Sequence, residues 1–232
     1  MEENKDLSAL SNESAANAAY SGPKRSSAFA VVEAYNTIRT NIMFTLTGKK
    51  GSAFIISSPI KNEGKTTTAV NTAISFSQMG AKTLLIDCDL RNPSVHKKLN
   101  IQKDSGVSDV LVGFSTFEES VISMNPYLDV LCAGSMPPNP SVLLGSQAFE
   151  ELLQNARENY AYVIIDTPPL CIVTDALIIA PKTEGVVLVA KNKSTLHEDF
   201  KRATAAVEFA GATLLGAILN KTSTHLTHYR YD

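Results

Sequence analysis

SSPIKNEGKTTT, at residues 57–68, is the stretch that determines the fold expected of this chain. It follows the short apolar run AFIIS at 53–57 and opens a stretch of helical periodicity from Thr66 to Met79. A second apolar run, TLLID at 83–87, comes directly afterwards. The three parts together have the length of one strand-helix-strand unit, so the quoted segment is predicted to be a polar loop between a buried strand and a helix.

Similar apolar runs predict further strands. They are LDVLCA at 128–133, YVIID at 162–166, GVVLVA at 185–190 and LLGAILN at 214–220. Helical patterns lie between them at 146–159, 174–180 and 195–211. Strands that alternate with helices indicate the α/β class, with a mainly parallel β-sheet flanked by helices on both faces.

The two ends of the sequence lack this alternation. Residues 1–27 are rich in Ser, Asn and Ala and predict a flexible arm, and a helix is expected from about Ala28 to about Leu46. The last residues, 223–232, are polar, without apolar periodicity, and predict a flexible tail. A single domain is therefore expected over 28–222.

Composition excludes several classes of protein. The 232 residues carry 21 basic and 23 acidic side chains, so no global positive field favours nucleic acid as a partner. Cys88, Cys132 and Cys171 are widely separated, which favours reduced thiols over disulfides or a zinc site. No window approaches the roughly 18 apolar residues of a membrane-spanning helix, and no secretory signal opens the chain. A cytoplasmic protein is expected.

The loop at 57–68 has the composition of a phosphate-binding loop. Backbone N–H groups between a strand and a helix can surround phosphate oxygens, Gly64 permits close approach, Lys65 supplies positive charge and the Thr66 hydroxyl can bind Mg²⁺. Pro59 stands where the usual pattern has its first glycine, so the match rests on GKT and its setting. The loop residues predicted to bind nucleotide are Asn62, Glu63, Gly64, Lys65, Thr66 and Thr67.

Carboxylates follow two of the predicted strands. Asp87 and Asp89 lie in LLIDCDLRNP, and Asp166 ends YVIID. Ligands bind at the carboxyl ends of parallel strands, so Asp87 and Asp89 favour a cation or a proton acceptor, and Asp166 has the position of the acid that holds Mg²⁺ in P-loop enzymes. The alternatives are a helix cap or an Asp89–Arg91 salt bridge at the first pair, and a simple turn at Asp166.

In combination these motifs resemble the bacterial tyrosine kinases, a family of P-loop kinases that control capsule and exopolysaccharide synthesis. LLIDCDLR is similar to the family's second acidic motif, VIIDTPP to its third, and GSMPPNPSVLL at 134–144 to its Pro-Pro-Asn-Pro segment. The resemblance covers nearly the whole chain from about Phe29 to Asp232. It implies an ATP-dependent protein-tyrosine kinase that phosphorylates its own tail.

The resemblance also implies the roles of individual residues. Asp87 or Asp89 accepts the tyrosyl proton, and Tyr229 and Tyr231 in the tail are the phosphoacceptors. The implied catalytic set is Lys65, Asp87, Asp89 and Asp166, and the implied Mg²⁺ ligands are Thr66, Asp87 and Asp166. Arg91 and Asn220 complete the predicted nucleotide-binding set. Asn220 and Lys221 end the last predicted strand, where they either border the base or form a strand-end turn.

The family's E-x-x-R-x-x-R motif joins subunits into a ring. EAYNTIR at 33–39 keeps Glu33 and Arg39 for oligomerisation but has Asn36 in the middle, which weakens the expected ring because one guanidinium is missing. The other implied partners are the cytoplasmic tail of a separate transmembrane activator, which recruits the kinase to the inner face of the membrane, a cognate tyrosine phosphatase and other protein substrates.

Two other functions remain open from the sequence. An ATPase switch like those that position chromosomes and septa has a signature lysine at the position of Ile60, and Lys61 follows one residue later. A non-catalytic nucleotide-binding scaffold for polysaccharide assembly is the second alternative, and the intact phosphate loop and acidic residues argue against it.

Overall fold

A computed structural model describes residues 23–46, 51–102 and 105–222 of the chain. It divides into two units, Met1–Ala34 and Tyr35–Asp232, which are described separately. The second unit contains the sheet, the predicted phosphate-binding loop and the three predicted site carboxylates. The predicted tail and most of the predicted arm lie outside the described residues.

The first helix, α1, runs from Pro23 to Thr45 and contains the boundary between the two units. Its start lies before the expected one at about Ala28, so the last residues assigned to the arm are helical. Proline is compatible with the first turn of a helix because its missing N–H has no partner there in any case. From Tyr35 onward α1 belongs to the second unit, and its Ile42 is buried there.

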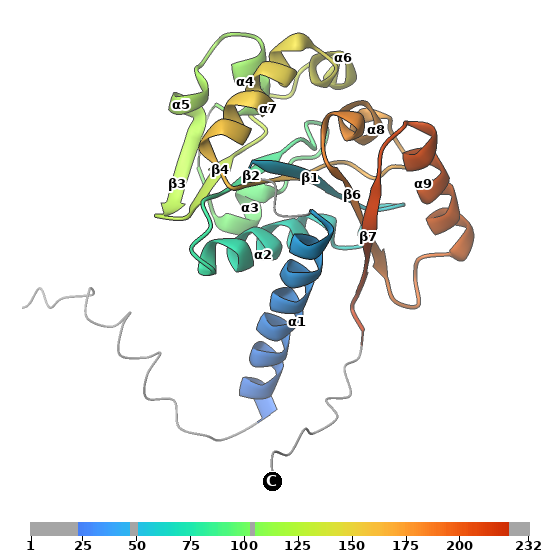
Figure 1. The fold of residues 1–232 in the computed structure, drawn as a ribbon. Coiled ribbons are helices and arrows are strands. Elements are labelled where there is room, and N and C mark those ends of the chain that lie inside the picture. The colour runs from blue at the N-terminus through green and yellow to red at the C-terminus, as the bar shows by residue number, and fades with distance from the viewer. Residues whose placement is uncertain (1–22, 47–50, 103–104, 223–232) are drawn as a thin grey trace, which may run out of the picture. The chain divides into compact units, whose positions relative to one another are not determined.

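One seven-stranded sheet forms the centre of the second unit, in the order β3-β4-β2-β5-β1-β6-β7 (Figure 1). Its strands are β1 Ser52–Ser57, β2 Thr83–Asp87, β3 Val121–Asn125, β4 Leu128–Leu131, β5 Tyr162–Asp166, β6 Gly185–Lys191 and β7 Leu214–Asn220. All neighbouring pairs are parallel except β3 and β4, which are antiparallel. The predicted mainly parallel sheet is confirmed.

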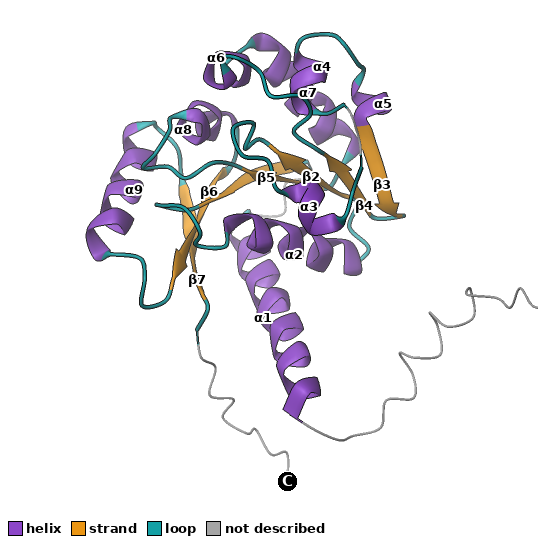
Figure 2. Cartoon of the chain, turned by 180° about the vertical axis from the view of Figure 1, so that it is seen from behind, coloured by secondary structure: helices purple, strands orange, loops and turns teal. Residues whose placement is uncertain are grey.

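Helices cover both faces of this sheet, as the view from behind shows (Figure 2). They are α2 Lys65–Gln78, α3 Val95–Leu99, α4 Val107–Leu111, α5 Phe117–Ser120, α6 Pro140–Leu144, α7 Gln147–Asn159, α8 Asp175–Ile179 and α9 His197–Phe209, with a 3₁₀ turn at Ala180–Lys182. The helices predicted at 66–79, 146–159 and 195–211 correspond to α2, α7 and α9, and the one predicted at 174–180 corresponds to the five-residue α8. Their spacing of apolar residues was sufficient to predict them because each packs one face onto the sheet.

The side chains of each strand point alternately to the two faces of the sheet, and an apolar core lies on each face. In β1, Ala53 and Ile55 belong to the core under α7, α8 and α9, whereas Phe54 and Ile56 belong to the core under α2 and α3. Successive side chains of a strand point to opposite faces, so a strand that reads as continuously apolar must be covered on both. This arrangement fixes the carboxyl end of β1, where the phosphate loop begins.

The sequence did not predict β3 or the short helices α3 to α6. Strand β3 lies at the sheet edge and its side chains are exposed or half-buried, so it has no apolar run. Each of these helices has only four or five residues, too few for helical periodicity to be visible. Helix α5 is instead stabilised at its N-terminus, where Thr116 and Glu119 form a reciprocal capping box.

Phe76 allows a test of the core between α2 and the sheet. Its buried ring lies 6.1 Å from the Phe54 ring and 4.4 Å from the Tyr162 ring, measured between centroids. We expect Phe76→Ala to lower the free energy of unfolding by about 3–5 kcal/mol in urea titrations. Phe209→Ala, at a ring that is 96% exposed, is the control and should change it by less than about 0.5 kcal/mol. Equal losses in the two variants would contradict this account of the core.

Candidate nucleotide and phosphoryl-transfer site

The phosphate loop joins the end of β1 to the start of α2 and requires two left-handed residues. Asn62 has φ 65° and Gly64 has φ 96°. The side-chain amide of Asn220, at the end of β7, donates to the carbonyl of Glu63 over 2.8 Å. A Cβ atom at Gly64 would collide with that amide nitrogen. Glycine is therefore required at position 64 both by the backbone conformation and by the close approach of β7.

The side chain of Glu63 is turned into the protein and shapes the loop. It is buried, and its carboxylate accepts a hydrogen bond from the backbone N–H of Ile60 over 3.1 Å and another from the Thr195 hydroxyl. Thr195 in turn accepts from the backbone N–H of Lys191 over 2.7 Å. The carboxylate thus ties the loop to the segment after β6. Glu63 was predicted to bind nucleotide, and this arrangement leaves its backbone for that role.

Lys65 lies at the centre of the acidic groups. Its Nζ is 2.8 Å from Asp89 Oδ2 and 3.4 Å from Asp166 Oδ2, and its side chain is 13% exposed. Burial lowers the pKa of Lys65, but Asp166 and Asp89 raise it, and the net shift is upward. The ammonium therefore stays charged at neutral pH and neutralises the carboxylates around it.

Asp166 joins the ends of two strands to the phosphate loop. It lies beside Asp87 in the register of β5 and β2, and it accepts a 2.6 Å hydrogen bond from the Thr66 hydroxyl. Complete burial raises the pKa of Asp166 to about 7, and Lys65 and Thr66 counteract part of that rise. Ser94 adds a hydrogen bond to the Thr66 hydroxyl over 3.0 Å. The carboxylate and the two hydroxyls are oxygen groups of the kind that Mg²⁺ binds.

Asp87 is the buried end of β2 and caps the next helix. Its carboxylate accepts backbone N–H bonds from Asp89, Ser94 and Val95 over 3.0–3.1 Å. Burial raises the pKa of Asp87, although these bonds and Lys65 act against the rise. The helix-cap alternative considered from the sequence is therefore observed at Asp87, and it leaves the predicted metal and base roles as predictions.

Asp89 and Arg91 do not share one salt bridge, contrary to the alternative considered from the sequence. Asp89 pairs with Lys65, whereas Arg91 pairs with Asp175 through Nε at 2.7 Å and Nη2 at 3.0 Å. Ser141 Oγ accepts a further bond from Arg91 Nη2 over 2.9 Å. Hydrogen bonding to Asp175 raises the pKa of Arg91, whose guanidinium is therefore permanently charged.

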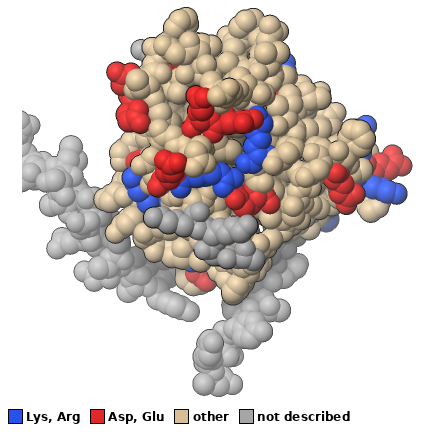
Figure 3. All heavy atoms as spheres, turned by 45° about the horizontal axis from the view of Figure 1, so that its top comes forward, with Lys and Arg blue, Asp and Glu red and all other residues tan. Residues whose placement is uncertain are grey.

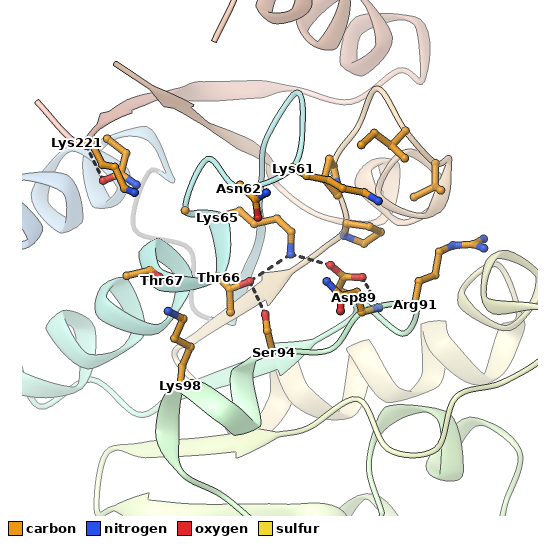
Figure 4. A pocket seen from close by; sticks show the side chains of 17 residues that line it. Lys61, Asn62, Lys65, Thr66, Thr67, Asp89, Arg91, Ser94, Lys98 and Lys221 are labelled. Atoms are coloured by element: carbon orange, nitrogen blue, oxygen red, sulfur yellow. Dashed lines mark hydrogen bonds and ion pairs between the residues drawn. The ribbon is translucent and has the colours of Figure 1, made fainter. Parts of the chain in front are cut away.

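A cavity of about 620 Å³ opens beside Lys65, Asp89 and Arg91, and Figure 4 shows the side chains that line it. The basic residues that line it are Lys61, Lys65, Arg91, Lys98 and Lys221, and the acidic one is Asp89. Gly64, Thr66, Thr67 and the N-terminus of α2 form its floor on the phosphate-loop side. A polyphosphate fits this surplus of positive charge, the glycine and the helix N-terminus.

Charged residues also lie outside this cavity. On the face drawn in Figure 3, acidic and basic side chains lie next to one another. In the described ranges no group of three or more His, Cys, Asp and Glu residues has the arrangement of a metal site. Cys88 and Cys132 are buried and Cys171 is half-buried, all as free thiols, and burial raises the pKa of Cys88 well above its usual range.

The predicted site residues are thus partly brought together. The cavity is lined by Asn62, Gly64, Lys65, Thr66, Thr67, Asp89, Arg91 and Asn220, while Glu63, Asp87 and Asp166 are buried behind it. The predicted acceptors Tyr229 and Tyr231 lie outside the described residues. Sequence reasoning missed Ser94, Ser141, Asp175 and Thr195. No signal in the sequence could have found Asp175, because it pairs with Arg91 from 84 positions away.

The two predicted ring residues are separated by the boundary between the units. Glu33 is exposed on α1 within the first unit. Arg39 belongs to the second unit, where its Nη1 donates to the Ser75 carbonyl over 2.6 Å, to the Ser75 hydroxyl over 3.0 Å and to Asn36 Oδ1 over 3.1 Å. Arg39 therefore holds α1 against α2, and its role between subunits stays a prediction.

Known proteins are similar to this chain in sequence and in fold. The tyrosine-protein kinase YwqD of Bacillus subtilis (strain 168) is 42% identical over 202 residues, which cover 86% of this chain and 85% of YwqD. The chain belongs to the bacterial tyrosine kinase family. The resemblance stated from the sequence motifs is confirmed, and the model of the AAA domain family also matches residues 62–196.

Two solved structures are similar to this chain in fold. The chimerical protein CapA2B2 has a TM-score of 0.78 and 39% identity, over 82% of this chain and 84% of that one. The septum site-determining protein MinD of Pyrococcus horikoshii has a TM-score of 0.62 at 22% identity, over 72% and 69% of the two chains. The second likeness concerns the fold alone. No helix among the described residues of this kinase is long and apolar enough to cross a membrane.

Gly64 and Gly80 allow a matched test of the loop. Both have positive φ, 96° and 80°, but a Cβ atom would meet Asn220 at Gly64 and nothing within 4 Å at Gly80. Each alanine variant should lose about 1–2 kcal/mol of stability to backbone strain. We expect Gly64→Ala alone to weaken binding of a fluorescent ATP analogue, by at least about tenfold. Equal affinities of the two variants would show that the Asn220 contact does not shape the loop.

The lowered pKa of Asp175 leads us to expect a specific dependence of stability on pH. Burial opposes ionisation, but hydrogen bonds from Arg91 and Ser141 lower the pKa of Asp175 below its ordinary value. A carboxyl group with a lowered pKa stabilises the fold above its unfolded pKa, and that contribution is lost as pH falls through the folded value. Between about pH 5 and pH 3 the unfolding free energy of the wild type should therefore fall more steeply than that of Asp175→Asn. Parallel curves from denaturant titrations would refute this.

Proposed function

We propose that this kinase transfers the γ-phosphate of ATP to tyrosines in its own C-terminal tail. The observation that supports the proposal is the position of Lys65 between the phosphate loop and the carboxylates of Asp89 and Asp166. Phosphoryl transfer requires a cation on the transferred phosphate and a proton acceptor beside it. Lys65 and the carboxylate of Asp89 supply both groups, and they lie in direct contact.

The loop and helix α2 would hold the phosphates. Lys65 and the backbone around Gly64 face the β- and γ-phosphates, and the N-terminus of α2 adds its dipole. Thr66 and Asp166 would hold Mg²⁺, with Asp87 behind them, and a bound Mg²⁺ neutralises charge on the phosphate oxygens. Asn220 fixes the wall of the loop next to Gly64, and with Lys221 it lines the cavity where the base is expected.

The transfer itself forms one bond and breaks another. The tyrosyl oxygen bonds to the γ-phosphorus, the bond from that phosphorus to the β–γ bridging oxygen breaks, and ADP leaves with that oxygen. The tyrosyl proton passes to Asp87 or Asp89. Asp89 lines the cavity, whereas the Asp87 carboxylate accepts three backbone N–H bonds. Asp89 is thus the carboxylate on the cavity side, and an acceptor hydroxyl would meet it beside its ion pair with Lys65.

The kinase would regulate capsule and exopolysaccharide synthesis together with a membrane partner. Its likeness to the chimerical protein CapA2B2 supports a two-component arrangement, in which the cytoplasmic tail of a transmembrane activator recruits the chain to the inner face of the membrane. A ring of kinase subunits, a cognate tyrosine phosphatase and other protein substrates complete this proposal. Within a ring, the tail of one subunit would enter the cavity of the next.

The competing function is an ATPase switch, because the fold is shared with MinD. Lys61 lines the cavity one residue after the signature position and is available to bind phosphate. The two functions differ in the acceptor of the phosphate, which is tyrosine in a kinase and water in an ATPase.

Labelling with γ-labelled ATP and Mg²⁺ tests the proposal, with and without a candidate activator tail. We expect mass spectrometry to find phosphate on Tyr229 and Tyr231 in the wild type. Lys65→Met should abolish the label because the phosphate loses its cation, and the Tyr229→Phe/Tyr231→Phe double variant should abolish it while still binding ATP. Lys97→Met, at an exposed lysine of α3 outside the cavity, is the matched control and should label normally.

Mixing two inactive chains tests transfer between subunits. Lys65→Ala supplies a tail without a working site, and the double tyrosine variant supplies a site without acceptors. Label on the tail of the Lys65→Ala chain is expected. Release of inorganic phosphate without any phosphotyrosine, even with the activator tail present, would favour the ATPase switch instead.

A further inference from the structure

The cavity extends past Asp89 to groups that phosphate binding does not require. Arg91 points away from Lys65 and Thr66, and Asp89 lies between them and Arg91 (Figure 4). The cavity also has an apolar wall, which consists of Pro168, Pro169, Ile172 and Val173, and this segment leads directly to Asp175, the partner of Arg91. If the phosphates lie against the loop, this second half of the cavity is on the acceptor side of Asp89.

Arg91 is held in one orientation there. Its Nε and Nη2 bind both oxygens of Asp175, whose side chain is completely buried, and Nη2 also binds Ser141. The Arg91 side chain itself is 41% exposed, and its Nη1 makes no hydrogen bond to any other residue in the described part of the chain. A guanidinium fixed along one edge presents its remaining donors at low entropic cost, and carboxylates are the groups that such donors recognise.

The apolar wall suits an aromatic ring. It comes from the segment between β5 and α8, and Ile172 is 47% exposed although it lines a cavity. Aromatic side chains bury a large area against such surfaces while their polar end remains accessible. Because Asp175 begins α8, the Arg91–Asp175 pair also fixes this wall relative to β2. A tyrosine against the wall would place its ring near Arg91 and its hydroxyl toward Asp89.

We propose that Arg91 and this apolar wall form an acceptor subsite that selects a tyrosine followed by an acidic residue. The occupant is the end of the tail of a second copy of this chain, where Asp232 follows Tyr231. The other tail tyrosine, Tyr229, is followed by Arg230, which Arg91 repels. The subsite rests on the proposed kinase function, and it predicts that Tyr231 is the preferred acceptor of the two.

Exchanging the charges in the tail tests this preference without altering the cavity. In the wild type, mass spectrometry over a time course should find Tyr231 labelled about fivefold faster than Tyr229, as expected for one partly exposed charge pair. The Arg230→Asp/Asp232→Arg variant should reverse that order, because the acidic residue then follows Tyr229. An unchanged order would overturn the subsite.

Peptides test the contribution of Arg91 directly. Two peptides of residues 224–232 carry Tyr229→Phe and end in an amide, and one of them also carries Asp232→Asn, so that a single side chain differs. The wild type should phosphorylate the Asp peptide with a KM about fivefold lower than that of the Asn peptide. Arg91→Gln should remove this difference in KM between the two peptides. Lys97→Gln removes one exposed charge of α3 outside the cavity and should keep the difference.

Loss of Arg91 leaves Asp175 buried without its cationic partner, so the variant is also made with Asp175→Asn, and both are checked by thermal unfolding. A wild type that uses the two peptides equally, or an Arg91 variant that keeps the preference, would refute the subsite while leaving the kinase function intact. A wild type that labels neither its own tail nor either peptide would refute the kinase function and the subsite with it.

Discussion

The ion pair of Lys65 with Asp89, and the contact of the same ammonium with Asp166, is the interaction on which the site depends. Two strands deliver carboxylates to a place where they are almost fully buried, and a buried charge without a partner is very costly. Lys65 supplies the positive charge at 2.8 Å and 3.4 Å, and Thr66 supplies a hydrogen bond. The same lysine that makes the cluster tolerable is the cation that we propose for phosphoryl transfer.

The sheet brings these groups together because its strands are parallel and in register. Asp87 and Asp166 are direct neighbours across β2 and β5, and β1 ends beside β5 where the phosphate loop begins. The edge strand β7 then closes the loop from the other side through Asn220. Each group comes from a different strand end, so the rigidity of the sheet sets the distances within the site.

Beyond the cluster, the cavity is organised by a second ion pair. Arg91 follows β2 and Asp175 begins α8, so their bidentate contact links the acidic motif to the segment after β5. The sequence motif D-x-D-x-R therefore supplies two different charge pairs, one with the phosphate loop and one with α8. In the proposed arrangement, this division would separate a phosphate side of the cavity from an acceptor side, with Asp89 between them.

The sequence by itself determined the fold class, the phosphate loop, the acidic positions and, through these motifs, the family. Apolar runs and the GKT segment depend only on residues that are close together in the chain, so the sequence is sufficient to predict the strands and the loop. Only the tertiary structure decided the partners: Asp89 with Lys65 rather than Arg91, Glu63 turned inward to Thr195, and Asp175 and Ser141 beside Arg91. Strand β3 and the short helices could also be identified only in the tertiary structure, since they are stabilised by strand pairing and helix caps. Such contacts join residues far apart in the chain, and their geometry follows from packing that no local pattern encodes.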